Sequence, residues 1–477
     1  MSEQPPAAAP IWRRPGLWLV VCLVVGLAAR LGAIAYVHTM KVRVAGGQVV
    51  DPSTQPLFPD SFEYLRAAEG LLKGKGLGVG EGSEIGRMPG YPVFLAAVEV
   101  VFGYNLLAMR VMQALLGVVS VWLAYLLGRE LFGTKEALAA AAVTAVYPFF
   151  LVFSVLLLSE ALFITLLLAG AVCLAKALGS GSESERERAS SLSPSPSPFT
   201  FSAVCCGLFF GLATLVRASF LLVVPLTAVG WVAAKRFRRA AAWRASLMLA
   251  TCALVMVPWV ARNWRVTGGH LVLTTLRTGP SLYEGLNPRA EGGPMMDDLR
   301  RELDGPAVEG MSEYERDRFW RQRAVEFARE NPGRVLGLAL KKLGRFWNVT
   351  PNLVQLQSPL HRYGLGVPYV VVMLFALVGL ARSWRRGDVV LILMLPVVYY
   401  AVVHMVFVGS VRYRVPIMPL LVVLAGHGIA ILWRRRKGGQ GTATHRDRAD
   451  VQRIAIGGRD AGAGAGGPND EAGGGGG

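Results

Sequence analysis

Long apolar runs follow one another along most of this 477-residue chain and limit what it can fold into. Hydrophobic residues make up 53% of the sequence, and charged residues only 17%. A soluble domain seldom has such a composition, whereas a run of about 20 apolar residues can cross a bilayer as a helix. Because lipid cannot hydrogen-bond to the backbone, helices are the expected structure of these runs. The sequence therefore predicts an all-α, polytopic membrane protein.

The apolar runs predict about ten transmembrane helices. They lie at roughly 17–37, 106–128, 137–151, 154–177, 201–217, 219–234, 242–260, 366–382, 388–408 and 414–433. A further apolar stretch at 91–102 is too short to cross, since a spanning helix needs about 20 residues. We predict that this stretch forms an interfacial or re-entrant helix.

Basic residues gather between the apolar runs and indicate how the chain is oriented. The formal net charge is +18, and short basic clusters lie at 235–239, 382–386 and 434–437. Lys and Arg are enriched in the cytoplasmic loops of membrane proteins, so topology explains the charge without a nucleic-acid partner. Ten crossings then place both termini in the cytoplasm and make the protein a multi-pass component of the inner (plasma) membrane.

The runs and the segments between them divide the chain into predicted regions. These are a cytoplasmic N-terminus with the first helix (1–37), a first external loop with the re-entrant helix (38–105), a transmembrane core (106–260) containing a disordered cytoplasmic linker (180–198), a second external loop domain (261–365), the C-terminal helices (366–433) and a disordered cytoplasmic tail (434–477). The linker is rich in Ser and Pro and the tail in Gly, and neither has apolar periodicity. The second loop has a helical pattern at 311–343 with a break at Asn331-Pro332, so we expect a small, partly helical domain.

Acidic residues at the outer ends of the predicted helices are the first candidates for chemistry. Asp60 and Glu63 lie in the first external loop and would share one helix face with Tyr64. Asp60 is either a helix cap or a general base, and Glu63 is either a capping partner or a second functional carboxylate. Glu160 begins a predicted span, where a carboxylate is costly unless it is paired or functional. Its alternative role is a structural ion pair with Arg30.

Arginines on the same predicted face form a second group of candidates. Few basic residues are expected on the external side, so an excess there indicates an anionic partner such as a lipid-linked phosphate. The guanidinium group matches the geometry of phosphate oxygens. The group consists of Arg87, Arg217, Arg262, Arg412 and Arg414. For Arg87, the alternative is an anchor at the membrane surface.

The sequence gives no signal for a resident cofactor. The five cysteines lie in apolar segments and are interpreted as packing residues. The chain has no P-loop, no GxGxxG and no His-Glu-x-x-His, and we assign no residue to a metal. The use of a divalent metal stays an open alternative, because no feature of the sequence tests it.

Several short motifs, in order, resemble a known family. They are Asp60–Tyr64, Arg87–Pro92, Ser159–Leu162, Leu215–Arg217, Pro258–Asn263 and Arg412–Pro416. Together they resemble the bacterial GT-C membrane glycosyltransferases of family 39, the group of protein O-mannosyltransferases and lipid A aminoarabinose transferases. The resemblance implies a GT-C helical bundle, with Asp60 as the catalytic carboxylate, Glu160 as a second acidic position and Arg87 as a ligand of the donor phosphate. Glu63, Tyr64 and Tyr91 lie beside these positions and are candidate substrate contacts.

The resemblance also implies a function. We expect an enzyme that transfers a hexosyl or pentosyl group, with inversion, from a polyprenyl-phosphate donor to a lipid, glycan or protein acceptor outside the cytoplasm. Two departures count against a protein acceptor: Asp60 is followed by Ser61 rather than Glu, and the long β-trefoil insertion is missing. The alternatives are a flippase or transporter of lipid-linked sugars and a glycan polymerase or ligase of the O-antigen type. Transporters usually have internal repeats, which this sequence lacks.

Overall fold

The computed structural model describes residues 14–43, 49–79, 83–179, 198–350 and 359–434. Residues up to Ile429 form one compact unit, and of the second unit, from Ala430 onward, only 430–434 are described. The predicted linker at 180–198 and tail at 434–477 lie outside the described residues, apart from residues 198 and 434.

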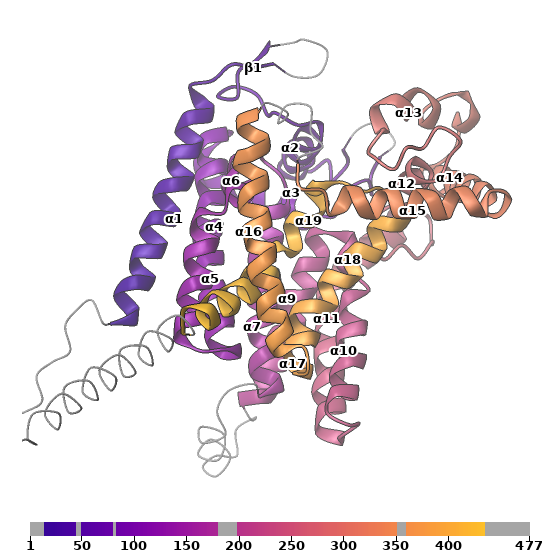
Figure 1. The fold of residues 1–477 in the computed structure, drawn as a ribbon. Coiled ribbons are helices and arrows are strands. Elements are labelled where there is room, and N and C mark those ends of the chain that lie inside the picture. The colour runs from indigo at the N-terminus through magenta and orange to yellow at the C-terminus, as the bar shows by residue number, and fades with distance from the viewer. Residues whose placement is uncertain (1–13, 44–48, 80–82, 180–197, 351–358, 435–477) are drawn as a thin grey trace, which may run out of the picture. The chain divides into compact units, whose positions relative to one another are not determined.

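Long apolar helices dominate the described part of the chain (Figure 1). Eight of its helical segments are long and apolar enough to cross a membrane. They are α1 (Pro15–His38), α4 (Leu106–Leu131), α7 (Glu160–Leu178), α9 (Pro198–Val216), α11 (Arg239–Val266), most of α16 (Pro359–Ser383), the segment Gly387–Val406 and the segment Val411–Arg434. The chain is therefore a multi-pass membrane protein.

The last two of these segments consist of several helical pieces. Gly387–Val406 contains α17 (Gly387–Val389), the π-helical turn η5 (Val390–Met394) and α18 (Leu395–Val406). Val411–Arg434 contains α19 (Val411–Arg414), the 3₁₀ turn η6 (Val415–Ile417) and helical residues 418–434.

Two predicted spans take a different form in the structure. The run at 137–151 becomes a bent pair, α5 (Thr134–Val146) and α6 (Pro148–Val155), with an angle of 47° between them. Pro148 explains the break, because a proline disfavours helical backbone at the residue before it. The run at 219–234 becomes η2 (Ala218–Phe220) and α10 (Val223–Ala234), shorter than the ~20 residues of a full crossing. The all-α bundle is confirmed, with eight or nine spans by length among the described residues rather than ten.

Two short helices lie between α1 and α4. They are α2 (Pro59–Leu72) and α3 (Gly90–Phe102), and they follow a two-stranded antiparallel ribbon of β1 (Val42–Arg43) and β2 (Val49–Val50). The predicted short helix at 91–102 is therefore present as α3. At 1.5 Å per residue it is about 20 Å long, less than the ~30 Å hydrocarbon core. It packs on α2, α4 and α9.

A group of helices between α11 and α16 confirms the predicted partly helical region. It contains α12 (Thr278–Gly285), α13 (Met296–Leu303), η3 (Pro306–Val308), α14 (Glu313–Glu330) and α15 (Pro332–Phe346). Ser312 and Glu315 form a capping box at the start of α14. The break between α14 and α15 falls at Asn331-Pro332, as the sequence predicts.

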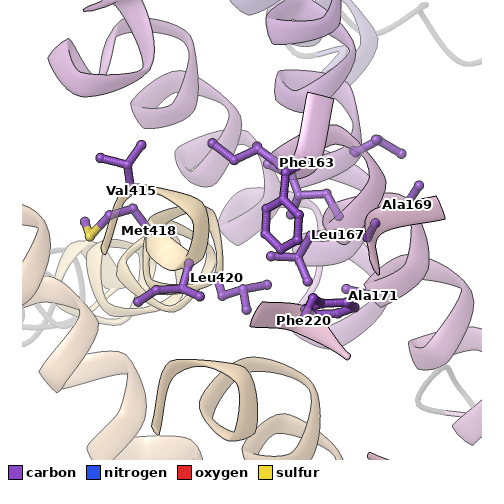
Figure 2. Close-up of a cluster of buried hydrophobic side chains, with 14 of the residues drawn as sticks. Phe163, Leu167, Ala169, Ala171, Phe220, Val415, Met418 and Leu420 are labelled. Carbon is purple, nitrogen blue, oxygen red and sulfur yellow. The ribbon is translucent and has the colours of Figure 1, made fainter. Parts of the chain in front are cut away.

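The centre of the hydrophobic core lies around α7, which packs on α4 and α9. Figure 2 shows Phe163 and Leu167 of α7 facing Phe220, with Val415 and Met418 nearby. The rings of Phe163 and Phe220 meet edge to face with centroids 5.4 Å apart. Because α7 is surrounded in this way, its first residue is fixed well inside the bundle.

Two hydrogen bonds join helix ends at one end of the bundle. Arg244, near the start of α11, donates to the carbonyl of Ala177 at the end of α7 (3.4 Å). Arg386, just before α17, donates to the carbonyl of Leu131 at the end of α4 (2.8 Å). Basic residues thus gather at this end of the bundle, and the first residues of α7 and α19 lie at the other.

Candidate active site

Asp60 and Glu63 lie in the first turns of α2, on one face of the helix. The helix begins at Pro59, a position that favours proline, and Phe58 is its N-cap residue. No side chain caps the helix, so the alternative in which Asp60 is the cap is wrong. The carboxylate oxygens of Asp60 accept hydrogen bonds from arginine side chains instead.

Arg87 binds both carboxylates of α2. Its Nη2 donates to Oδ1 of Asp60 at 2.5 Å, and its Nε donates to Oε2 of Glu63 at 2.6 Å. The second oxygen of Asp60 accepts from Nη1 of Arg412 at 2.6 Å. Oε2 of Glu63 also accepts from Nη1 of Arg277 at 2.7 Å. A row of alternating charges therefore joins α2 to the three segments that carry Arg87, Arg277 and Arg412.

Glu160 extends this row of charges into the helical bundle. It is the first residue of α7, it is fully buried, and its Oε1 accepts from Nε of Arg412 at 2.8 Å. Arg412 therefore bridges Asp60 and Glu160. Nη1 of Arg217 lies 3.2 Å from the same Oε1, but it makes no hydrogen bond, and Oε2 of Glu160 has no hydrogen-bond partner either.

The alternative in which Glu160 pairs with Arg30 is wrong. Arg30 is buried within the bundle and donates to the carbonyls of Gly26 (2.8 Å), Ala145 (3.0 Å) and Thr144 (3.3 Å). Backbone carbonyls of α1 and of the end of α5 therefore bind both Nη atoms of Arg30, whereas its buried Nε has no hydrogen-bond partner.

We call this set the ionic network, and its charge is positive. Four arginines (Arg87, Arg217, Arg277, Arg412) face three carboxylates (Asp60, Glu63, Glu160), which leaves one positive charge in excess. Such charges are stable out of water only when they are paired, and these are.

The arginines keep both carboxylates of α2 ionised. Burial alone would raise the pKa of Asp60, but the charges of Arg87 and Arg412 and the hydrogen bond from Arg412 hold that pKa well below its ordinary value. The pKa of Glu63 is also lowered, because Arg87 and Arg277 outweigh the effect of burial. In the same way Asp60 and Glu63 raise the pKa of Arg87 against the opposing effect of burial.

Tyr64 and Tyr91 lie next to the ionic network but take no part in its ion pairs. The guanidinium carbon of Arg87 is 5.3 Å from the ring centre of Tyr64. The two tyrosine rings meet edge to face, and the Tyr64 hydroxyl lies 3.4 Å from Oγ of Ser159. Tyr91 is fully buried and donates to Oε1 of Gln113 at 2.6 Å. Tyr64 thus packs against Arg87, and Tyr91 packs against Tyr64.

Two arginines singled out from the sequence lie apart from the network. Nη2 of Arg262 is 3.2 Å from Oε2 of Glu84, in the loop before Arg87. Arg414 is buried, donates to the carbonyl of Phe346 at 3.1 Å and stacks over the ring of Tyr369 at 3.6 Å. Arg414 therefore fixes the end of α15 in place and does not reach Asp60 or Glu160.

Sequence analysis missed Arg277. It lies directly before α12, and it forms an ion pair with Glu63. The available signal was weak, since Arg277 is one of many arginines in the long segment between α11 and α16. Only the folded arrangement brings that segment back onto α2.

A second residue missed from the sequence, the carboxylate Glu313, positions the loop that carries Arg87. Glu313, at the start of α14, accepts from the backbone N–H groups of Glu84 (2.9 Å) and Ile85 (3.0 Å). Burial raises the pKa of Glu313 although these hydrogen bonds act in the opposite direction. The loop before Arg87 is thus anchored to the helical region between α11 and α16.

Among the residues that the structure describes, no group of three or more His, Cys, Asp or Glu side chains is arranged to hold a metal ion. The three carboxylates of the ionic network each have a guanidinium group as their neighbour. We therefore assign no metal ligands.

Comparison with known proteins finds similarity in part of the sequence and in the fold. Residues 87–262 match the family model of the dolichyl-phosphate-mannose-protein mannosyltransferases. This segment begins at Arg87 and contains Glu160 and Arg217. No curated protein sequence matches the chain significantly.

Solved structures resemble the whole fold. The oligosaccharyltransferase of Archaeoglobus fulgidus in complex with Zn and sulfate matches with a TM-score of 0.55 and 15% identity, over 91% of this chain and 51% of that chain. AglB from the same organism, in complex with an inhibitory peptide and a dolichol-phosphate, matches with a TM-score of 0.52 and 13% identity, over 90% and 52%. ArnT from Cupriavidus metallidurans, bound to undecaprenyl phosphate, matches over 88% and 78% with 15% identity, but its TM-score of 0.40 is too low to support a common fold.

The chain has the fold of the GT-C membrane glycosyltransferases, which confirms the resemblance inferred from its motifs. Within that fold, its segment 87–262 is similar to the protein mannosyltransferases. The chain spans about half the length of the archaeal enzymes that it matches.

Proposed function

We propose that this protein is a glycosyltransferase that moves a sugar from a polyprenyl-phosphate donor to an acceptor hydroxyl outside the cytoplasm, with inversion. The observation that carries the proposal is the ionic network at one end of the bundle, with its excess positive charge. The family model and the GT-C fold support a donor that is held by a lipid phosphate.

The arginines suit a phosphate leaving group. When the bond between sugar and phosphate breaks, negative charge grows on the phosphate, and fixed cations stabilise it. Arg217 is the best placed of them, because its Nη1 is buried without a hydrogen-bond partner and its side chain is only 13% exposed. Arg277 also belongs to the ionic network and contributes to its excess positive charge.

Asp60 is the proposed general base, and its arginine partners would control its strength. A carboxylate with a strongly lowered pKa takes protons poorly. If a donor phosphate drew Arg87 and Arg412 toward itself, their hold on Asp60 would weaken and its pKa would rise. Asp60 would then be strong enough to take the proton from the acceptor hydroxyl only when the donor is bound.

The proposed external location follows from the basic residues at the opposite end of the bundle. Arg244 and Arg386 lie at that end, next to the basic clusters at 235–239 and 382–386. By the positive-inside rule that end belongs in the cytoplasm, so the network would face outward. The acceptor would then be an envelope lipid, glycan or protein.

A transfer assay in detergent tests this function. The purified chain is incubated with polyprenyl-phosphate sugars and envelope extracts, and products are identified by mass spectrometry beside extracts of cells that lack the protein. Transfer in micelles supports the proposal, because micelles have no two compartments between which a flippase could move its substrate. A product whose formation needs sealed vesicles, or no sugar-bearing product at all, would count against it.

Arg217 and Arg262 are expected to respond differently to truncation. In Arg217→Ala the phosphate loses a charge-assisted donor worth roughly 1.5–3 kcal/mol, so the Kd for the polyprenyl-phosphate donor should rise about 10- to 100-fold. Arg262→Ala is the matched control, because Arg262 pairs with Glu84 outside the network. Binding is measured directly with the purified variants, and equal weakening in both would contradict the role given to Arg217.

The pH dependence should differ between the free and the donor-bound protein. The profile of kcat/KM reports the free enzyme, where the lowered pKa of Asp60 keeps its base form down to low pH. The profile of kcat reports the donor complex, where we expect that pKa to be higher. Activity is lost as pH falls through the pKa, so the acid limb of kcat should lie at higher pH than that of kcat/KM. Glu63→Gln removes the other carboxylate of α2 as a source of the limb, and coincident limbs in that variant would refute the mechanism.

A further inference from the structure

Helix α15 has an apolar face that no other described part of the chain covers. Leu336 and Leu340 are 63% and 58% exposed, and they lie one turn apart on the same side of the helix. Their neighbours Gly333, Gly337 and Gly344 have no atoms within 4 Å of the place where a Cβ would stand. This side of α15 is therefore open, smooth and apolar.

The neighbouring helix α14 has an outer surface of the opposite kind. Apart from Val325, its exposed side chains are charged or polar. They are Glu315, Arg318, Arg321, Gln322, Arg323, Glu326, Arg329 and Glu330. Water is the natural environment of that surface, whereas the leucines and glycines of α15 form an apolar surface that suits lipid.

The position of α15 puts its open face at the end of a membrane span. Nζ of the buried Lys342 donates at 2.7 Å to the carbonyl of Val406, the last residue of the span Gly387–Val406. Gly409 donates to the carbonyl of Gly292 at 3.0 Å. Figure 1 shows α15 lying crosswise to the long helices, where it packs on α18. If the long helices cross the membrane, a helix that lies crosswise at their end is suited to run parallel to the membrane surface.

The charge of α15 complements an anionic surface. Its sequence contains four basic residues and no acidic one. Arg334 and Lys341 are exposed beside the open face. A helix that presents leucines to lipid chains and basic residues to headgroups binds in the plane of the bilayer interface.

We propose that α15 lies in the outer surface of the bilayer, with Leu336 and Leu340 inserted among lipid chains and Lys341 directed to anionic headgroups. The membrane contact of α15 is then linked to the segment that leads to Arg412, because Lys342 and Arg345 donate hydrogen bonds to the carbonyls of Val406 and Gly409. This placement does not depend on which sugar the protein transfers.

Photocrosslinking tests the placement in the intact chain. The photoreactive residue p-benzoylphenylalanine replaces Leu336 or Leu340, or Glu326 on α14 as the matched control, in nanodiscs of phosphatidylcholine and phosphatidylglycerol. We expect lipid adducts at 336 and 340 at a yield about tenfold or more above that at 326. Adducts between two protein chains would assign the face to a second copy, and equal yields at all three positions would leave it in water. Either result overturns the proposal.

The same assay tests the headgroup contact. The adducts at 340 should be enriched in phosphatidylglycerol over its share of the nanodisc, and Lys341→Gln should remove the enrichment while total lipid adduct stays unchanged. Adducts that follow the lipid composition in the unaltered chain would refute the role given to Lys341.

Discussion

Asp60→Asn is expected to lower the rate of sugar transfer by about two to four orders of magnitude, the usual contribution of a general base. The amide keeps the size of the carboxylate and one acceptor oxygen, but it cannot take a proton from the acceptor hydroxyl. Binding of the polyprenyl-phosphate donor should persist, since the arginines are unchanged. Turnover and donor binding are both measured on the purified variant.

Asp51→Asn is the matched control for this substitution. Asp51 lies in the same segment between α1 and α4, and its carboxylate binds Ser53 rather than an arginine of the network. Full activity in Asp51→Asn together with the loss in Asp60→Asn would assign the effect to the network. Normal turnover in Asp60→Asn would remove Asp60 from the chemistry.

Arg412→Met is expected to reduce stability as well as transfer. Arg412 is the one described side chain that bridges Asp60 and Glu160, and its own side chain is 16% exposed. Breaking a buried ion pair costs about 3–5 kcal/mol. Asp60 and Glu160 each lose one of two arginine partners and keep the other, Arg87 or Arg217, so the cost should lie at the lower end of that range. The free energy of unfolding in detergent and the transfer rate should therefore both fall sharply.

A second substitution separates the two effects. Arg412→Lys keeps a cation between Asp60 and Glu160, so most of the lost stability should return. A single ammonium group lacks the planar fork of the guanidinium, so transfer should stay low. Arg382→Met, at an exposed arginine near the end of α16, is the control and should change neither. Full transfer in Arg412→Lys would show that Arg412 acts only as a structural counter-ion.

Local sequence patterns predicted the helices well, because apolar length and helix-breaking residues act over short distances. The order of the spans, the short helix α3 and the break at Asn331-Pro332 were all readable from the chain. The bend at Pro148 was missed although proline is a known break, because the apolar run continues through it.

The pairing of charges was predicted poorly, because it depends on which helix ends meet in the fold. Arg30 and Glu160 were both predicted near the outer ends of their spans, yet Arg30 donates to backbone carbonyls instead. Arg277 reaches Glu63 only because the segment after α11 folds back over α2. Arg262 and Arg414 belong to the predicted set by position, but their side chains have other partners.

The bridge made by Arg412 has a consequence for biosynthesis. Arg412 follows Asp60 by 352 residues, so at 5–20 residues per second it is synthesised roughly 20–70 s later. Before then, three carboxylates balance three arginines, and the site is neutral. Its excess positive charge therefore arises only when Arg412, at the start of the last span, has been made.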